Sequence, residues 1–144
     1  MIKVGDFMTR TVFTIPRDAT LAEAAAALSS RSVDGAPVCD PHGRIVGMVS
    51  KGDLAEGCYS DRLKVCQSVG DVMSLDVIRA HSDDDIEAIS KLLVFEGAHR
   101  AIVVDESDAM IGIVTPLDVL RAIVQTPARF DPARASKDVR VGAR

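Results

Sequence analysis

The sequence contains two copies of one pattern, separated by a constant offset of 65 residues and aligned without gaps. Residues 4–54 and 69–119 share 13 identities in 51 positions, and most other pairs keep their hydrophobic or polar character. Val-Gly-Asp opens both copies, and Gly-x-Val followed by Ser or Thr and then x-x-Asp ends both. A tandem duplication of this kind implies one fold for both copies, so each inference about one repeat constrains the other.

Hydrophobic periodicity predicts the order β-α-β-β-α in each repeat. A unit of about 50 residues with three strands cannot bury its sheet and helices alone, so the two repeats should share a core. We predict an α/β (α+β) fold of two tandem repeats packed about a pseudo-two-fold axis, with a cleft on each side. The expected strands are 12–15, 36–39, 45–49, 77–80, 101–104 and 110–114. The expected helices are a short turn over 4–8, a helix that opens at Thr20 with its apolar face over 21–28, and helices over 52–58, 84–95 and 116–125. The expected boundaries are 1–62 for repeat 1, 63–127 for repeat 2 and 128–144 for a basic tail.

Composition narrows the function. The chain has 47% hydrophobic residues, no apolar run long enough to span a membrane and no signal-peptide pattern at its start, which predicts a cytoplasmic protein without membrane contact. The whole chain has a net charge of −4. The tail contributes +3, so residues 1–127 together have a net charge of −7. An acidic body with 3% aromatic residues argues against nucleic acid as a partner.

The sequence contains no recognisable catalytic motif. The three cysteines show no C-x-x-C spacing, and we find no nucleophile beside a base, no cluster of metal ligands and no phosphate-binding P-loop. We therefore expect a protein that is not an enzyme and that requires neither a metal nor a cofactor.

The best candidate site lies where the second repeat begins its last helix. Thr115 and Pro116 open that helix, Asp118 lies in its first turn, and His99 and Arg100 precede the buried strand 101–104. Unpaired amides at the helix start and a fixed cation favour an anion, whereas the carboxylate suits neighbouring hydroxyls such as a ribose diol. The same Thr-x-x-Asp pattern is also a capping box, which needs no ligand.

The doubled pattern resembles a cystathionine-β-synthase (CBS) domain pair, or Bateman module. The marks are Val-Gly-Asp-x-Met at the start of each repeat, Thr-Ile-Pro at 14–16, the second strands Ala-Pro-Val-Cys-Asp at 36–40 and Ala-Ile-Val-Val-Asp at 101–105, and the two Gly-x-Val-Ser/Thr-x-x-Asp segments at 47–53 and 112–118. The resemblance covers nearly everything before residue 127. It implies a regulatory module that binds adenosine-containing ligands, namely AMP, ADP, ATP or S-adenosylmethionine, in the clefts between the repeats.

The resemblance also implies the role of each residue. The Asp of Ser/Thr-x-x-Asp holds the ribose hydroxyls, the Ser or Thr lies near the phosphates, basic residues before the second strand reach phosphate, and the base packs on the first strand of the other repeat. The expected main cleft comprises Thr14, Ile15, His99, Arg100, Ile102, Thr115 and Asp118. The expected second cleft comprises Pro37, Ser50, Asp53, Arg79 and Ala80.

The two clefts are not expected to bind equally. The positions that match His99 and Arg100 in the first repeat are Asp34 and Gly35, and an acid there should repel phosphate. Arg79 either compensates in the second cleft or is a solvated surface residue. We expect one tightly bound nucleotide per chain, in the Asp118 cleft.

Two further expectations concern association. The apolar residues of 92–95 and 119–124 exceed the needs of a small core and predict a homodimer, and an unidentified protein partner is the second expectation. The alternative function is a structural or protein-interaction module with the same fold and no ligand.

Overall fold

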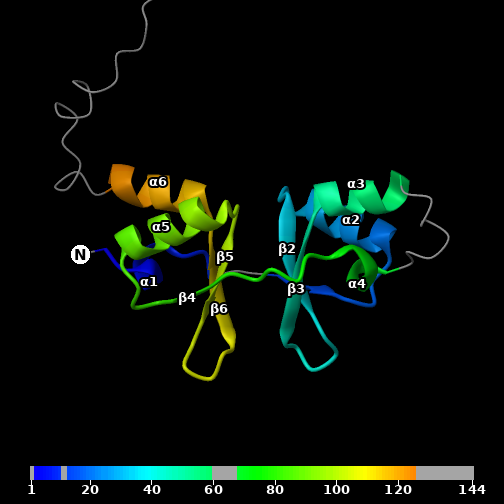
Figure 1. Cartoon of the computed structure of the whole chain (residues 1–144), viewed down its shortest axis with the longest axis horizontal. Coiled ribbons are helices and arrows are strands. Elements are labelled where there is room, and N and C mark those ends of the chain that lie inside the picture. The colour runs from blue at the N-terminus through cyan, green and yellow to red at the C-terminus, as the bar shows by residue number, and fades with distance from the viewer. Residues whose placement is uncertain (1, 11–12, 60–67, 126–144) are drawn as a thin grey trace, which may run out of the picture.

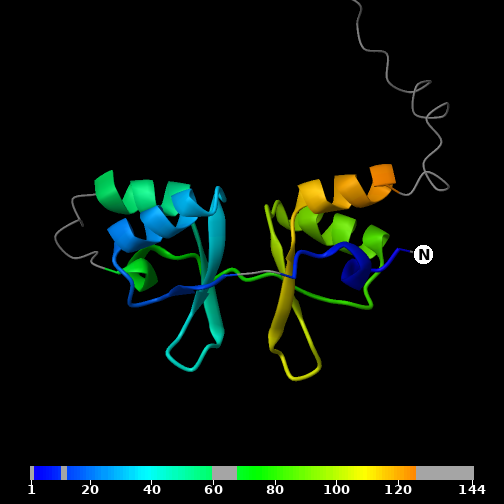
Figure 2. The same ribbon diagram turned by 180° about the vertical axis from the view of Figure 1, so that it is seen from behind.

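The computed structural model describes residues 2–10, 13–59 and 68–125, which form two halves with one three-stranded sheet each (Figure 1, Figure 2). In each sheet the first strand runs parallel to the second, and the second runs antiparallel to the third. The elements of the first repeat are α1 (Val4–Phe7), β1 (Ile15–Pro16), α2 (Leu21–Ser30), β2 (Gly35–Cys39), β3 (Ile45–Ser50) and α3 (Lys51–Tyr59). Those of the second are α4 (Val69–Val72), β4 (Arg79–His81), α5 (Ile86–Glu96), β5 (Ala101–Val104), β6 (Met110–Val114) and α6 (Pro116–Gln125).

This architecture confirms the predicted fold class and order of elements. The first strand of each repeat is the exception, because it is shorter and later than the apolar run that predicted it. Ile15 pairs with Val38, and Arg79 pairs with Ile102. The preceding apolar residues of the second repeat, Val77 and Ile78, line a cleft and are not part of β4. The boundary at 62/63, Val12 and the tail lie outside the described residues.

Local hydrogen bonds explain where the long helices begin. Thr20 Oγ1 accepts the Glu23 backbone N–H at 3.1 Å at the start of α2, and Asp85 Oδ1 accepts the Ala88 N–H at 2.8 Å at the start of α5. Side chains of this kind satisfy amides that have no partner in the first turn. The last turn of α5 leads into Gly97, whose φ of 59° is left-handed.

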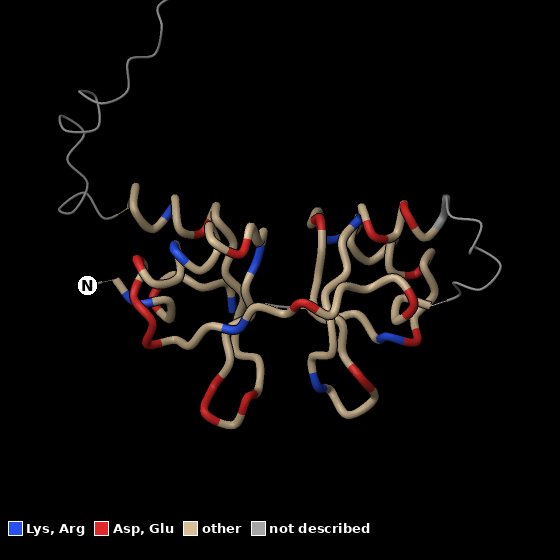
Figure 3. Tube along the Cα trace, viewed as in Figure 1, with Lys and Arg blue, Asp and Glu red and all other residues tan. Residues whose placement is uncertain are grey.

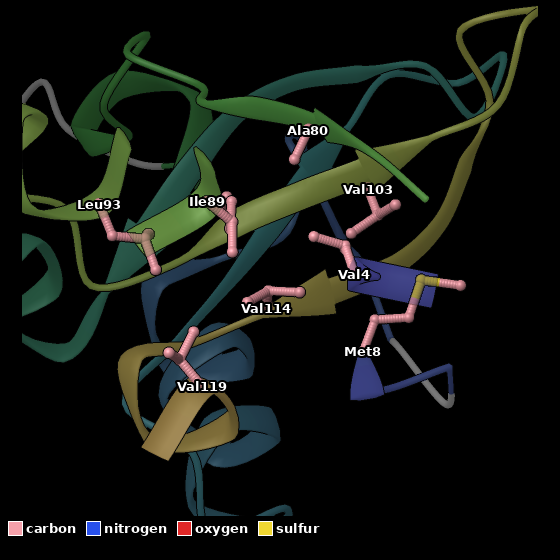
Figure 4. Packing of buried hydrophobic residues seen from close by; sticks show 9 residues of the cluster. Val4, Met8, Ala80, Ile89, Leu93, Val103, Val114 and Val119 are labelled. Atoms are coloured by element: carbon pink, nitrogen blue, oxygen red, sulfur yellow. The ribbon is translucent and has the colours of Figure 1, made fainter. Parts of the chain in front are cut away.

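The short helices α1 and α4 pack in the half opposite to their own repeat. Figure 4 shows Val4 and Met8, from the start of the chain, in one cluster with Val103, Val114 and Ile89 of the second repeat. The backbone N–H of Val4 donates to the Asp84 carbonyl at 2.8 Å. By the same exchange α4 completes the core of the first repeat, with the fully buried Val69 at its centre. A packing unit therefore differs from a repeat in the sequence.

The exchanged segments run directly beside the last strand of each sheet. Thr9 bridges Ile113, and Met48 bridges Ser74. A side chain at Gly112 would bring its Cβ to within 2.7 Å of the Met8 sulfur, which explains why glycine occurs here. This close crossing brings the segment before one repeat's first strand next to the other repeat's last helix. Each cleft is consequently built from both repeats.

No helix in the described part of the chain is long and apolar enough to cross a membrane. Several large apolar side chains of α5 and α6 are nevertheless exposed: Val94, Phe95, Leu117, Leu120 and Val124. Leu93 and Val119, from the same apolar segments, are buried in the core. Packing within the chain therefore buries only some of the apolar side chains of these two segments.

Candidate functional site

Two clefts lie between the repeats. The Asp118 cleft has a volume of about 850 Å³ and the Asp53 cleft about 720 Å³, both within the range of small-molecule sites. The Asp118 cleft is lined by Thr9, Phe13, residues 32–37, residues 50–52, His99, Arg100, Ile113 and residues 115–118. The Asp53 cleft is lined by residues 48–50, Asp53, residues 74–79, Leu92 and residues 96–100.

A reciprocal capping box stands at the centre of each cleft. The Thr115 N–H donates to Asp118 Oδ2 at 2.9 Å, and the Asp118 N–H donates to Thr115 Oγ1 at 3.2 Å. The Ser50 and Asp53 pair repeats this arrangement at 2.9 and 3.1 Å. In the described part of the chain the other oxygen of each carboxylate, Oδ1, has no hydrogen-bond partner. Each carboxylate therefore has a fixed orientation and one oxygen available to a ligand hydroxyl.

Arg100 lies between the two clefts and lines both of them. Its guanidinium occupies the space above Gly35, where an added Cβ would lie 2.7 Å from Arg100 Cζ. Burial lowers the pKa of Arg100 from its ordinary value, and the nearby carboxylates of Asp34 and Asp53 act in the opposite direction. Arginine has so high an ordinary pKa that the group stays cationic at neutral pH. The site thus has a partly buried positive charge.

The structure brings together four residues of the expected main cleft and separates three others from it. Thr115, Asp118, His99 and Arg100 line the Asp118 cleft. Ile102 is 1% exposed and buried in the core, since β5 is covered on both faces. Thr14 and Ile15 line a separate shallow pocket against α2 and are absent from both clefts.

The structure also separates the residues that were predicted for the second cleft. Ser50, Asp53 and Arg79 line the Asp53 cleft, and Ser50 borders the Asp118 cleft as well. Ala80 is buried in the core. Pro37 lines the Asp118 cleft and is not among the residues that line the Asp53 cleft.

The assignment of the acid at position 34 was wrong for the same reason. Asp34 and Gly35 line the Asp118 cleft, not the Asp53 cleft, while His99 and Arg100 border both. The residues before the second strand face the last helix of the other repeat across the pseudo-two-fold axis. Reasoning within one repeat therefore attached Asp34 and Gly35 to the wrong cleft, whereas His99 and Arg100 line the predicted Asp118 cleft and the Asp53 cleft as well.

Sequence reasoning missed one aromatic wall. Phe13 lines the Asp118 cleft, and the Arg31 guanidinium lies 4.5 Å from its ring centroid. Ile78 holds the matching position in the Asp53 cleft. Their place one or two residues before the first strand, in an apolar run longer than that strand, was the available signal. The aromatic ring gives the Asp118 cleft a surface on which a planar base can stack.

Charges around the clefts are mixed. Lys51 Nζ lies 3.9 Å from Asp34 Oδ1 in the Asp118 cleft, and Arg79 Nε of the Asp53 cleft lies 3.5 Å from Asp108 Oδ1. Figure 3 shows acidic residues on the β5–β6 turn, whereas the β2–β3 turn carries both signs. Within residues 2–10, 13–59 and 68–125 no group of three or more His, Cys, Asp or Glu could hold a metal ion.

Known proteins show the same construction. The chain is 29% identical to CBSX2 of Arabidopsis thaliana in its complex with AMP, over 88% of this chain and 99% of that one, with a TM-score of 0.79. It is 25% identical to the CBS domain pair of MJ0100 in complex with 5′-methylthioadenosine and S-adenosyl-L-methionine, over 83% and 98% of the two chains, with a TM-score of 0.73.

A longer relative matches in sequence. The uncharacterized protein MJ1232 of Methanocaldococcus jannaschii is 34% identical over 122 residues, which are 85% of this chain and 40% of that protein. The chain thus spans less than half of this relative's length. The CBS domain family matches residues 4–59 and 69–125, one match for each repeat. The chain therefore belongs to the CBS domain family and carries two such domains in tandem.

Proposed function

We propose that this chain is a non-catalytic regulatory module that binds adenosine-containing ligands in the clefts between its two CBS domains. The Asp118 cleft is the principal site. AMP, ADP and ATP are the first candidate ligands, and S-adenosylmethionine is the next. The target that the module regulates is a protein domain or partner in the cytoplasm.

The observation that carries this proposal is the combination at the Asp118 cleft of an oriented carboxylate, a cation and an aromatic wall. Asp118 presents Oδ1 to a ribose diol, Arg100 offers charged donors to a phosphate, and Phe13 offers a surface to the base. The AMP complex of CBSX2 and the adenosyl complexes of MJ0100, both CBS domain pairs, support the ligand class.

The alternative is a ligand-free structural module in which both Ser/Thr-x-x-Asp pairs serve only as helix caps. The capping hydrogen bonds are present in both repeats. Capping alone, however, gives no reason for a cleft of about 850 Å³ or for a partly buried arginine between two carboxylates. The ligand-binding reading is therefore favoured.

The test is a calorimetric and thermal-unfolding titration of the purified chain with AMP, ATP, S-adenosylmethionine and adenosine, with guanosine monophosphate as the matched control. A ligand at one hundred times its Kd should stabilise the folded state by about 2.7 kcal/mol. Saturable heat and a rise in Tm with adenosyl ligands, greater than with the guanine nucleotide, are expected. An unchanged Tm with all four would favour the ligand-free alternative.

We also propose that the exposed apolar faces of α5 and α6 form a homodimer interface. Phe95 is 82% exposed, Val94 76% and Val124 68%, while the buried residues of these helices face the core. Contiguous exposed apolar side chains commonly mark association sites. Multi-angle light scattering should report a dimer at micromolar concentration, and the pair of substitutions Phe95→Glu and Val124→Glu should yield monomer. A monomeric wild-type chain would contradict this assignment.

A further inference from the structure

The two clefts share a cation that comes from one repeat only. Ser50, His99 and Arg100 line both clefts, whereas Asp34 and Gly35, at the positions that match His99 and Arg100, line one. The duplication has therefore not produced one arginine for each cleft. One repeat has Arg100 at this position, and the other has Gly35, which has no side chain.

The carboxylates near Arg100 come from both clefts. Its guanidinium extends over Gly35, and the nearby carboxylates are Asp34 of the Asp118 cleft and Asp53 of the Asp53 cleft. Among the described residues Arg100 forms no ion pair, while Lys51 and Arg79, the other cations of the clefts, each lie near an acid. The guanidinium is thus not committed to either side by a partner in the protein.

Phosphate recognition requires close donor contact. A charge-assisted hydrogen bond is strong only at short distance, and the two N–H groups on one edge of the guanidinium can form a bidentate contact with only one anion at a time. A guanidinium that turns toward an anion in one cleft withdraws those donors from the other. Two anions bound together would then compete for one cation.

We propose that Arg100 is a single phosphate-binding cation shared by the two clefts, so that a phosphate-bearing adenosyl ligand in one cleft weakens the binding of a second in the other. This inference rests on the proposed function, because it needs both clefts to accept adenosyl ligands. Adenosine, which has no phosphate, should fill the clefts without this coupling. The module would therefore distinguish a phosphorylated ligand from an unphosphorylated one by how many molecules it holds.

The coupling is measurable from single-cleft variants. In Asp53→Ala the Asp118 cleft should bind first and the altered cleft at least about tenfold more weakly, and in Asp118→Ala the Asp53 cleft should bind first. The product of these two association constants, divided by the overall two-site constant of the wild type, is the coupling factor, which is reciprocal between the sites. Calorimetric titration of the wild type and of these two variants with AMP supplies the three constants.

We expect a coupling factor of about ten for AMP in the wild type, within the usual range for linked sites, and a factor near one for adenosine. The same three measurements in an Arg100→Gln background should give a weaker first AMP and a coupling factor reduced to about two. The remainder is the screened repulsion between two phosphates, which does not need Arg100. Arg44→Gln, on the exposed β2–β3 turn outside both clefts, is the matched control and should reproduce the wild-type constants.

The outcomes separate this inference from the proposed function. A coupling factor as large in Arg100→Gln as in the wild type, or two AMP molecules that bind independently or cooperatively to the wild type, would overturn the shared cation and leave the binding function intact. Absence of all adenosyl binding would remove both. Arg100→Lys keeps the charge and should retain part of the coupling, which guards against a folding defect in Arg100→Gln.

Discussion

The Asp118 cleft and the Asp53 cleft use the same positions of two repeats and have the same central hydrogen bonds, but their walls differ. Both carboxylates accept a backbone N–H at 2.9 Å. Phe13 lines the first cleft where Ile78 lines the second, and Arg79 lies in the second where Thr14 matches it in sequence. Duplication has thus preserved the group suited to a sugar while the groups suited to base and phosphate have diverged. Affinity differences should therefore follow the walls, not the carboxylates.

The largest expected effect comes from removing the preserved group. Asp118→Ala and Asp53→Ala should each weaken binding in their own cleft roughly 10- to 150-fold in Kd, because a hydrogen bond to a charged acceptor contributes about 1.5–3 kcal/mol. Calorimetry with adenosine measures this loss without phosphate effects.

Each substitution also removes a helix cap. Asp85→Ala is the matched control, since Asp85 caps α5 and lines neither cleft. It should lower the free energy of unfolding by about 0.5–2 kcal/mol and leave adenosine affinity unchanged. Wild-type adenosine affinity in Asp118→Ala would show that its carboxylate is only a cap.

Exchanging the divergent walls should narrow the difference between the clefts. Ile78→Phe should strengthen adenosine binding in the Asp53 cleft, and Phe13→Ile should weaken it in the Asp118 cleft, because stacking of a base on an aromatic ring contributes about 1–3 kcal/mol. Titrations in the Asp118→Ala and Asp53→Ala backgrounds isolate each effect. Unchanged affinities in both would show that the base lies elsewhere.

A smaller effect is expected from the acid in the Asp118 cleft. Asp34→Asn removes a negative charge and frees Lys51, so AMP should bind this cleft about two- to fivefold more tightly at low salt, with the gain lost at high salt. The Asp53→Ala background restricts the titration to the Asp118 cleft. Adenosine is the internal control, because it has no phosphate for Asp34 to repel. An equal gain for adenosine would contradict the electrostatic reason.

The last prediction concerns stability and not affinity, and it tests the backbone that leads into each cleft. Ser32, which follows α2, has a φ of 54°, and Gly97, at the matching position after α5, has a φ of 59°. Ser32→Gly should raise the free energy of unfolding by up to about 1 kcal/mol, whereas Gly97→Ser should lower it by about 1–2 kcal/mol, because a side chain is strained in this region. Urea unfolding of the two variants measures the difference. Destabilisation by both would show that Ser32 makes contacts that outweigh its strain.

Part of this structure could be predicted from the sequence because local signals were strong. The bounds of β5, β6 and α6 follow from an apolar run, a polar turn and Pro116. The short first strands could not be placed, because apolar residues before them face a cleft and resemble strand residues in sequence. β5 was assigned to a cleft wall through Ile102, although all four of its residues are buried.

The composition of each cleft was predicted less well than its central carboxylate. An offset of 65 residues relates equivalent positions, but it does not say which repeat supplies the opposite wall. That depends on packing across the axis, which places Asp34 in the same cleft as Asp118 and lets Arg100 line both clefts. The exchange of α1 and α4 is equally hidden, since both helices carry the same Val-Gly-Asp pattern.

The exchanged helices α1 and α4 also limit how a CBS domain of this chain can be combined with a CBS domain of another protein. A hybrid that joined the first CBS domain of this chain to a foreign second one at the sequence boundary would separate Val4 and Met8 from the pocket that evolved to hold them. Grafting the second packing unit requires residues 2–9 to travel with residues 75–125, as two inserted pieces. The repeat in the sequence and the packing unit in the structure thus differ by one short helix. Neither CBS domain can therefore be moved to another protein without the helix that the other repeat supplies.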